Sequence, residues 1–107
     1  MLRVGTTEVF SEGVLDASLN RLVIVDFWAT WCGPCKMLKP VLERIALDLP
    51  DALDVVLVDI ETNKELADQY HVSGTPTLLF FKDGLQVDNI VGAKTKPQLM
   101  EYIEKYI

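Results

Sequence analysis

A chain of 107 residues has the size of one domain, and its 50% hydrophobic and 24% charged residues are the proportions of an ordinary globular protein. Sixteen acidic residues against ten basic ones give a formal net charge of −6, which argues against nucleic acid and anionic membranes as partners. No apolar run approaches the roughly 20 residues needed to cross a bilayer, so we expect one soluble domain over residues 1–107.

The first half of the chain is predicted to contain a strand, a long helix and two less regular elements. Residues 2–4 are expected to form a short strand and residues 11–18 a helix. Residues 22–28 (LVIVDFW) are apolar and β-branched, which is typical of a strand buried on both faces. From Pro34 onward apolar residues recur at helical spacing, and this helix is expected to end at Pro50.

The next segment completes a strand–helix–strand unit. Residues 54–60 (DVVLVDI) read as a second buried strand, so the two strands are expected to be parallel, with a right-handed crossover. Residues 62–65 (TNKE) fit a capping box, which predicts a short helix that reaches about Tyr70.

The last third of the chain is predicted to form a hairpin and a helix. Residues 77–82 (TLLFFK) read as a strand, residues 83–84 (DG) as a two-residue turn, and residues 85–91 as the antiparallel return strand. Residues 95–98 (TKPQ) fit a capping box at the start of a final helix. Together the elements predict a mixed sheet flanked by helices.

The two cysteines lie in residues 31–36 (WCGPCK), where the first buried strand gives way to the long helix. The free N–H groups and positive dipole end of a helix start favour the thiolate of Cys32, which makes it the nucleophile. Cys32 would attack a disulfide in another molecule, and Cys35 would resolve the mixed disulfide. The alternative is a structural disulfide or a pair of buried thiols, which the strand-to-helix position disfavours.

The small number of cysteines limits other chemistry. Two cysteines and the single His71 fall short of the four ligands of a zinc site, so we expect neither a metal nor a cofactor. The first residues have no apolar core of signal-peptide length. Unless a segment before residue 1 has been removed, the expected compartment is the reducing cytoplasm.

Asp26 lies inside the apolar strand 22–28, where its neighbours are expected to be buried. A carboxylate that is buried without a partner loses its solvation, and its pKa rises. The alternative is an aspartate at a strand end that reaches water, and the residues alone leave both possibilities open.

The sequence resembles the thioredoxins over nearly its whole length. Residues 25–40 (VDFWATWCGPCKMLKP) are close to the family's signature, and residues 74–77 (GTPT), 80–84 (FFKDG) and 91–93 (VGA) fall at matching distances. The resemblance implies the thioredoxin fold, an α/β architecture whose five-stranded mixed sheet has the order 1-3-2-4-5 and is flanked by four helices. It also implies a monomeric dithiol–disulfide oxidoreductase, an electron carrier that reduces protein disulfides and is recharged by a thioredoxin reductase.

The resemblance further implies roles for residues around the dithiol. Asp26 would be buried beneath it and would move a proton to or from Cys35. The Thr75–Pro76 bond would be cis and would face the dithiol, and the Thr75 backbone would pair with an extended substrate segment. The substrate-docking surface would be formed by Trp31, Gly33, Pro34, Gly74, Thr75, Pro76, Val91, Gly92 and Ala93. Without the resemblance, Gly74, Val91, Gly92 and Ala93 are ordinary turn or strand residues.

Two positions depart from the bacterial members of the family. These members usually have a lysine on the strand beside the acid, whereas this chain has Leu57, and no lysine occurs in residues 54–60. We therefore expect a larger fraction of Asp26 to be protonated than in those members, which affects the rate of proton transfer. Thr75 replaces a common isoleucine and is expected to make the docking groove more polar.

Two other functions remain possible from the residues. An oxidase or isomerase would use the same chemistry in the reverse direction, but such relatives tend to have a histidine between the cysteines. Gly33 and Pro34 stand there instead and favour reduction. A binding module with idle thiols would keep the same fold, and the intact cysteine pair speaks against it.

Overall fold

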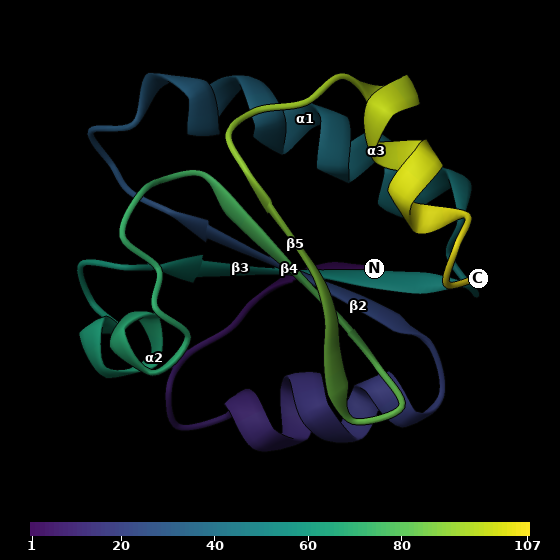
Figure 1. The fold of residues 1–107 in the computed structure, drawn as a ribbon, viewed down its shortest axis with the longest axis horizontal. Coiled ribbons are helices and arrows are strands. Elements are labelled where there is room, and N and C mark those ends of the chain that lie inside the picture. The colour runs from purple at the N-terminus through teal and green to yellow at the C-terminus, as the bar shows by residue number, and fades with distance from the viewer.

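The computed structural model describes residues 1–107 as a mixed sheet between two layers of helices (Figure 1). The sheet has the order β1-β3-β2-β4-β5, as predicted. Its strands are β1 Leu2–Val4, β2 Leu22–Trp28, β3 Leu53–Asp59, β4 Thr77–Lys82 and β5 Leu85–Val91. β3 runs parallel to β1 and β2, and β4 runs antiparallel to β2 and β5, which confirms both the crossover unit and the hairpin.

Helices cover both faces of the sheet. The α-helices are α1 Gly33–Asp48, α2 Lys64–Gln69 and α3 Lys96–Ile103. The helix predicted near residues 11–18 is present as a π-helical segment, η1 Ser11–Asp16, that continues into a 3₁₀ turn, η2 Ala17–Leu19. α1 and α3 lie on one face, and the N-terminal helical segment and α2 lie on the other (Figure 1). None of these helices has the length and apolar character that crossing a membrane requires.

Alternate residues of β2 pack into opposite layers. Leu22 and Ile24 belong to the core under α1 and α3, whereas Val23 and Val25 belong to the core under η1 and α2. Successive side chains of a strand point to opposite faces, so Asp26 continues the row of Leu22 and Ile24. This alternation turns the carboxylate of Asp26 toward the α1 layer.

Two of the predicted local motifs are confirmed. Asp83 and Gly84 have φ values of 55° and 80°, the positive values that a tight two-residue hairpin turn requires. At the start of α3, the Thr95 hydroxyl accepts a hydrogen bond from the Gln98 N–H, and the Gln98 side chain accepts one from the Thr95 N–H. This reciprocal pair is the predicted capping box.

The capping box predicted at residues 62–65 is wrong. Asn63 is the N-cap residue of α2, and its side chain makes no capping hydrogen bond. The side-chain oxygen of Asn63 instead accepts a hydrogen bond from the N–H of Thr7, and the side-chain NH₂ donates one to the backbone oxygen of Asp59. Asn63 therefore ties the segment after β1 to the end of β3. The helix starts one residue later than the predicted box requires, and the Thr62 hydroxyl accepts a hydrogen bond from the Asn63 side chain at 3.2 Å.

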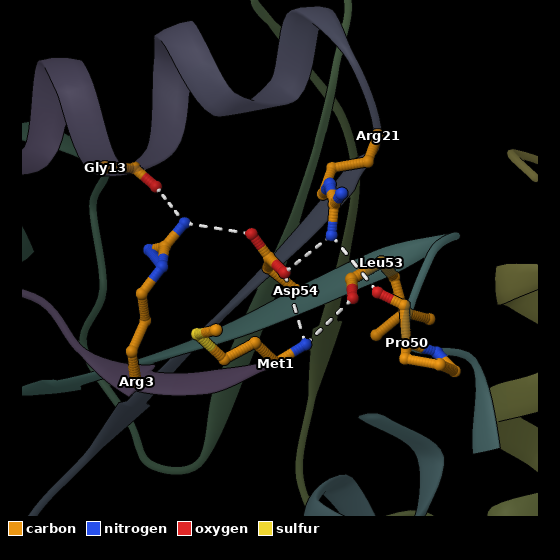
Figure 2. A network of polar contacts seen from close by, with 7 residues as sticks. All are labelled: Met1, Arg3, Gly13, Arg21, Pro50, Leu53 and Asp54. Carbon is orange, nitrogen blue, oxygen red and sulfur yellow. Dashed lines mark hydrogen bonds and ion pairs between the residues drawn. The ribbon is translucent and has the colours of Figure 1, made fainter. Parts of the chain in front are cut away.

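One carboxylate at the start of β3 joins distant parts of the chain (Figure 2). Asp54 accepts contacts of 3.2 Å each from the amino group of Met1, the guanidinium of Arg3 and the guanidinium of Arg21. Arg3 also donates to the carbonyl oxygen of Gly13 at 2.6 Å. Asp54 thus links β1, η1 and the start of β2 to β3.

We expect the substitution Asp54→Asn to destabilise the fold by about 2 kcal/mol. Removing one partner from a buried charge cluster leaves the remaining charges uncompensated, and partial exposure of both arginines moderates the loss. Urea denaturation at pH 7 measures the effect, with the exposed Asp51→Asn as the matched control. Equal stabilities of the two variants would contradict the structural role of the cluster.

Candidate redox site at the start of the long helix

Cys32 and Cys35 lie at the N-terminal end of α1 and form a disulfide, with their Cα atoms 5.3 Å apart. The two residues are 3% and 4% exposed. Pro34 lies in the first turn of the helix, where the N–H that proline lacks has no helical partner. The predicted position of the pair at a strand-to-helix junction is confirmed.

Cys32 is the N-cap residue of α1. Its backbone is extended, and its Sγ accepts a hydrogen bond from the N–H of Cys35 at 3.2 Å. The first turn of a helix presents such N–H groups together with the positive end of the helix dipole. A negative charge on this sulfur in the reduced protein would meet hydrogen-bond donors already in place, which supports Cys32 as the nucleophile.

Asp26 is enclosed by apolar neighbours. The residue is 1% exposed, and its Oδ1 has no hydrogen-bond partner. On the adjacent strands it lies opposite Leu57 of β3 and Leu78 of β4. Burial raises the pKa of Asp26 to about 7. The expected rise in pKa is therefore confirmed, and the alternative of an aspartate that reaches water is wrong.

A cavity of about 200 Å³ is lined by both Asp26 and Cys35. It runs between β2, β3 and the start of α1. Its lining residues are Asp26, Trp28, Ala29, Thr30, Cys35, Lys36, Lys39 and Leu57. Asp26 and Cys35 therefore share this one space.

Three loops leave the sheet at the same end as the cysteine pair. Phe27 of β2 pairs with Thr77 of β4, and Thr77 pairs with Val91 of β5. The loops after β2, before β4 and after β5 must therefore emerge together. A hydrogen bond of 2.8 Å from the Gly92 N–H to the Pro76 carbonyl oxygen joins the second and third loops.

The residues expected to dock substrate all lie in these loops, with different exposures. Exposed are Trp31, Gly33, Pro34, Val91 and Ala93; Gly74, Thr75 and Gly92 are half-buried; Pro76 is buried. The Thr75–Pro76 bond is cis, as the resemblance implies. The hydroxyl oxygen of Thr75 is buried without a hydrogen-bond partner, so the expectation of a more polar groove at Thr75 is wrong.

Two features of the site were not predicted from the sequence. The carboxylate of Glu61 accepts hydrogen bonds from the Thr30 N–H at 3.2 Å and from the Thr30 hydroxyl at 2.7 Å, which lower the pKa of Glu61. This contact anchors the loop before the cysteines to the end of β3, and no local pattern reveals it. Lys36 and Lys39 also line the cavity, and the helical spacing of Lys39 from Cys35 was a signal that could have been used.

Comparison with known proteins gives one consistent match. A family model described as "Thioredoxin" matches residues 2–105. The chain is 47% identical over 98 residues to a thioredoxin of Chlamydia trachomatis, covering 92% of this chain and 95% of that protein. It is 48% identical over 102 residues to a thioredoxin of Mycobacterium tuberculosis, covering 95% and 86%. The X-ray structure of Fasciola hepatica thioredoxin aligns with a TM-score of 0.88 at 37% identity, over 98% of this chain and 99% of that one.

Proposed function

The chain belongs to the thioredoxin family and is a dithiol–disulfide oxidoreductase, and from this premise we propose that it serves as a general reductase of protein disulfides. One observation carries the proposal: the Cys32–Cys35 disulfide closes at the start of α1, with Cys32 Sγ already accepting a backbone N–H. A sulfur held in this way is suited to reversible exchange, because the reduced pair has a stabilised thiolate ready to attack.

The proposed reaction begins with the reduced pair. The thiolate of Cys32 attacks one sulfur of the substrate disulfide, the substrate S–S bond breaks, and the other substrate sulfur leaves as a thiolate that takes up a proton. A mixed disulfide between Cys32 and the substrate remains. No electrons are lost in this step, since one S–S bond forms as another breaks.

Resolution of the mixed disulfide needs a proton acceptor. In the proposed step the carboxylate of Asp26 takes the proton of the Cys35 thiol, and the Cys35 thiolate attacks Cys32 Sγ. The bond between Cys32 and the substrate breaks as the Cys32–Cys35 bond forms, and the second substrate sulfur leaves as a thiolate that takes up a proton. The substrate has then gained two electrons and two protons. The pKa of Asp26 near 7 suits this role, because the group can both accept and return a proton close to neutral pH.

Substrate docking is proposed for the loops at this end of the sheet. Trp31 is 68% exposed and Val91 is 65% exposed, so both present apolar area to a partner. The backbone of Thr75 would pair with an extended segment of the substrate. The surrounding residues Gly33, Pro34, Gly74, Pro76, Gly92 and Ala93 have small or compact side chains, which would let such a segment come close to the buried disulfide.

The partners that follow are disulfide-containing proteins and a thioredoxin reductase that returns electrons to Cys32–Cys35. A reductase of this kind works where thiols are kept reduced, so we place it in the cytoplasm. The chain would act there as a monomeric electron carrier.

The reduction potential separates this function from that of an oxidase or isomerase. We expect the Cys32–Cys35 couple to have a reduction potential of about −270 mV, the value typical of thioredoxins. The reason is that Gly33 and Pro34 add no cation that would further stabilise the thiolate. Equilibration with glutathione buffers of graded ratio, followed by alkylation of free thiols, measures the potential. A potential near the about −120 mV of a strong oxidant would instead assign the chain to disulfide formation.

A further inference from the structure

Two lysines of α1 line the cavity that holds Asp26. Lys36 and Lys39 are both exposed residues, and neither forms a salt bridge. The cavity therefore has a buried carboxylate with an unpartnered oxygen on its β2 wall and two lysine side chains without salt-bridge partners on its helix wall.

The charged groups that face Asp26 come from α1 alone. β3 and β4 present Leu57 and Leu78 opposite the carboxylate. The other titratable groups that line the cavity are Cys35 and the two lysines. An ionised Asp26 in such walls loses solvation, so a cation that compensates its charge has to come from the helix side.

Helix geometry distinguishes the two lysines. Lys39 follows Cys35 by four residues, which places it on the same face of α1, one turn further along. Lys36 also lines the cavity, but it follows Cys35 by one residue and is therefore rotated by about 100° around the helix axis from Cys35. The aliphatic stem of Lys39 can lie along the apolar cavity wall while its ammonium group moves between solvent and the carboxylate.

We propose that Lys39 is a positioning residue for the proton step, because its ammonium group stabilises the ionised carboxylate of Asp26 across the cavity, in place of a cation on β3. Lys39 thereby sets the fraction of Asp26 that is ready to accept the proton of Cys35. This inference rests on the proposed reductase function, since it assigns a role within the same resolution step.

The test compares Lys39→Met with the matched control Lys36→Met, which removes the same charge from the same helix. Lys39→Met is expected to raise the pKa of Asp26 by about 0.5–1 unit, and Lys36→Met to leave it unchanged. Below this pKa, the rate of mixed-disulfide resolution falls about 3- to 10-fold in Lys39→Met. The rates converge with those of the wild type at alkaline pH. Carboxyl NMR titration of Asp26 and a pH series of single-turnover reduction of a protein disulfide provide the two readouts.

Two further variants show whether charge is the cause. Lys39→Arg keeps the cation and should retain the pH profile of the wild type. Leu57→Lys, added to Lys39→Met, should lower the Asp26 pKa again by supplying a cation from β3. A loss of packing alone would be corrected by neither change.

Three results would overturn the inference: an unchanged Asp26 pKa in Lys39→Met, an equal shift in Lys36→Met, or failure of Lys39→Arg to retain the profile. Each of these can occur while the wild-type protein still reduces protein disulfides, so the proposed function would stand. Failure of the wild type to reduce them would instead remove the proposed function itself.

Discussion

Replacing Cys35 by serine will arrest the protein at the mixed disulfide, because Cys32 can still attack a substrate but no thiol remains to resolve the product. Turnover of protein disulfides should fall by at least about 10³-fold, as is common when an essential reacting group is removed. Incubation of the reduced variant with a disulfide-containing protein should yield a covalent one-to-one complex. Nonreducing electrophoresis and intact mass measure the complex, and a thiol reductant should release it.

The matched variant Cys32→Ser separates the roles of the two sulfurs. It should lose turnover equally but form no covalent complex, because the sulfur that accepts the Cys35 N–H is absent. A complex formed by Cys32→Ser and not by Cys35→Ser would reverse the assignment of nucleophile and resolving thiol. Absence of turnover in the wild type itself would support the alternative of a binding module with idle thiols.

Asp26→Asn is expected to stabilise the protein above neutral pH and to slow resolution. Burial raises the pKa of Asp26 to about 7, whereas an aspartate of the unfolded chain has a pKa of about 3.9. Between these values the unfolded chain has already lost the proton that the native state retains, so native stability falls as pH rises through this window. The difference of about 3 pKa units corresponds to roughly 4 kcal/mol, which the uncharged asparagine does not lose.

The stability difference between Asp26→Asn and the wild type should therefore grow by roughly 4 kcal/mol from pH 3 to pH 8. Urea denaturation of the oxidised proteins over this range measures it, and the exposed Asp68→Asn provides a control whose difference should stay small. A difference that does not change with pH would show that Asp26 is solvated or paired in solution, and its role as proton acceptor would have to be withdrawn. In the reduced state the same variant should accumulate mixed disulfide, because the base for Cys35 is missing.

Features that depend on residues close together in the chain were predictable from the sequence. The apolar run 22–28 predicted β2 with its observed bounds, because burial on both faces leaves a continuous apolar pattern. The turn at residues 83–84 and the capping box at residues 95–98 were also correct, since each is formed by residues at most three positions apart. The position of the cysteine pair at the start of α1 was predictable for the same reason. The hydrogen bond that caps the helix joins Cys32 Sγ to the N–H of Cys35, within four residues.

Features that depend on contacts across the fold were decided only by the tertiary structure. The sequence left open whether Asp26 reaches water, and the answer came from Leu57 and Leu78 on the neighbouring strands. The capping box predicted at Thr62 did not form, and the N-cap of α2 is Asn63, whose side chain binds the N–H of Thr7, 56 residues away in the chain.

The Asp54 cluster and the cavity beneath Cys35 likewise assemble from segments that approach one another only when the sheet and α1 pack together. Local patterns show what a side chain could bind within its own turn or strand. Its partner is then whichever group the folded topology brings within a few ångströms, because polar interactions weaken quickly with distance and a buried polar group favours any available partner.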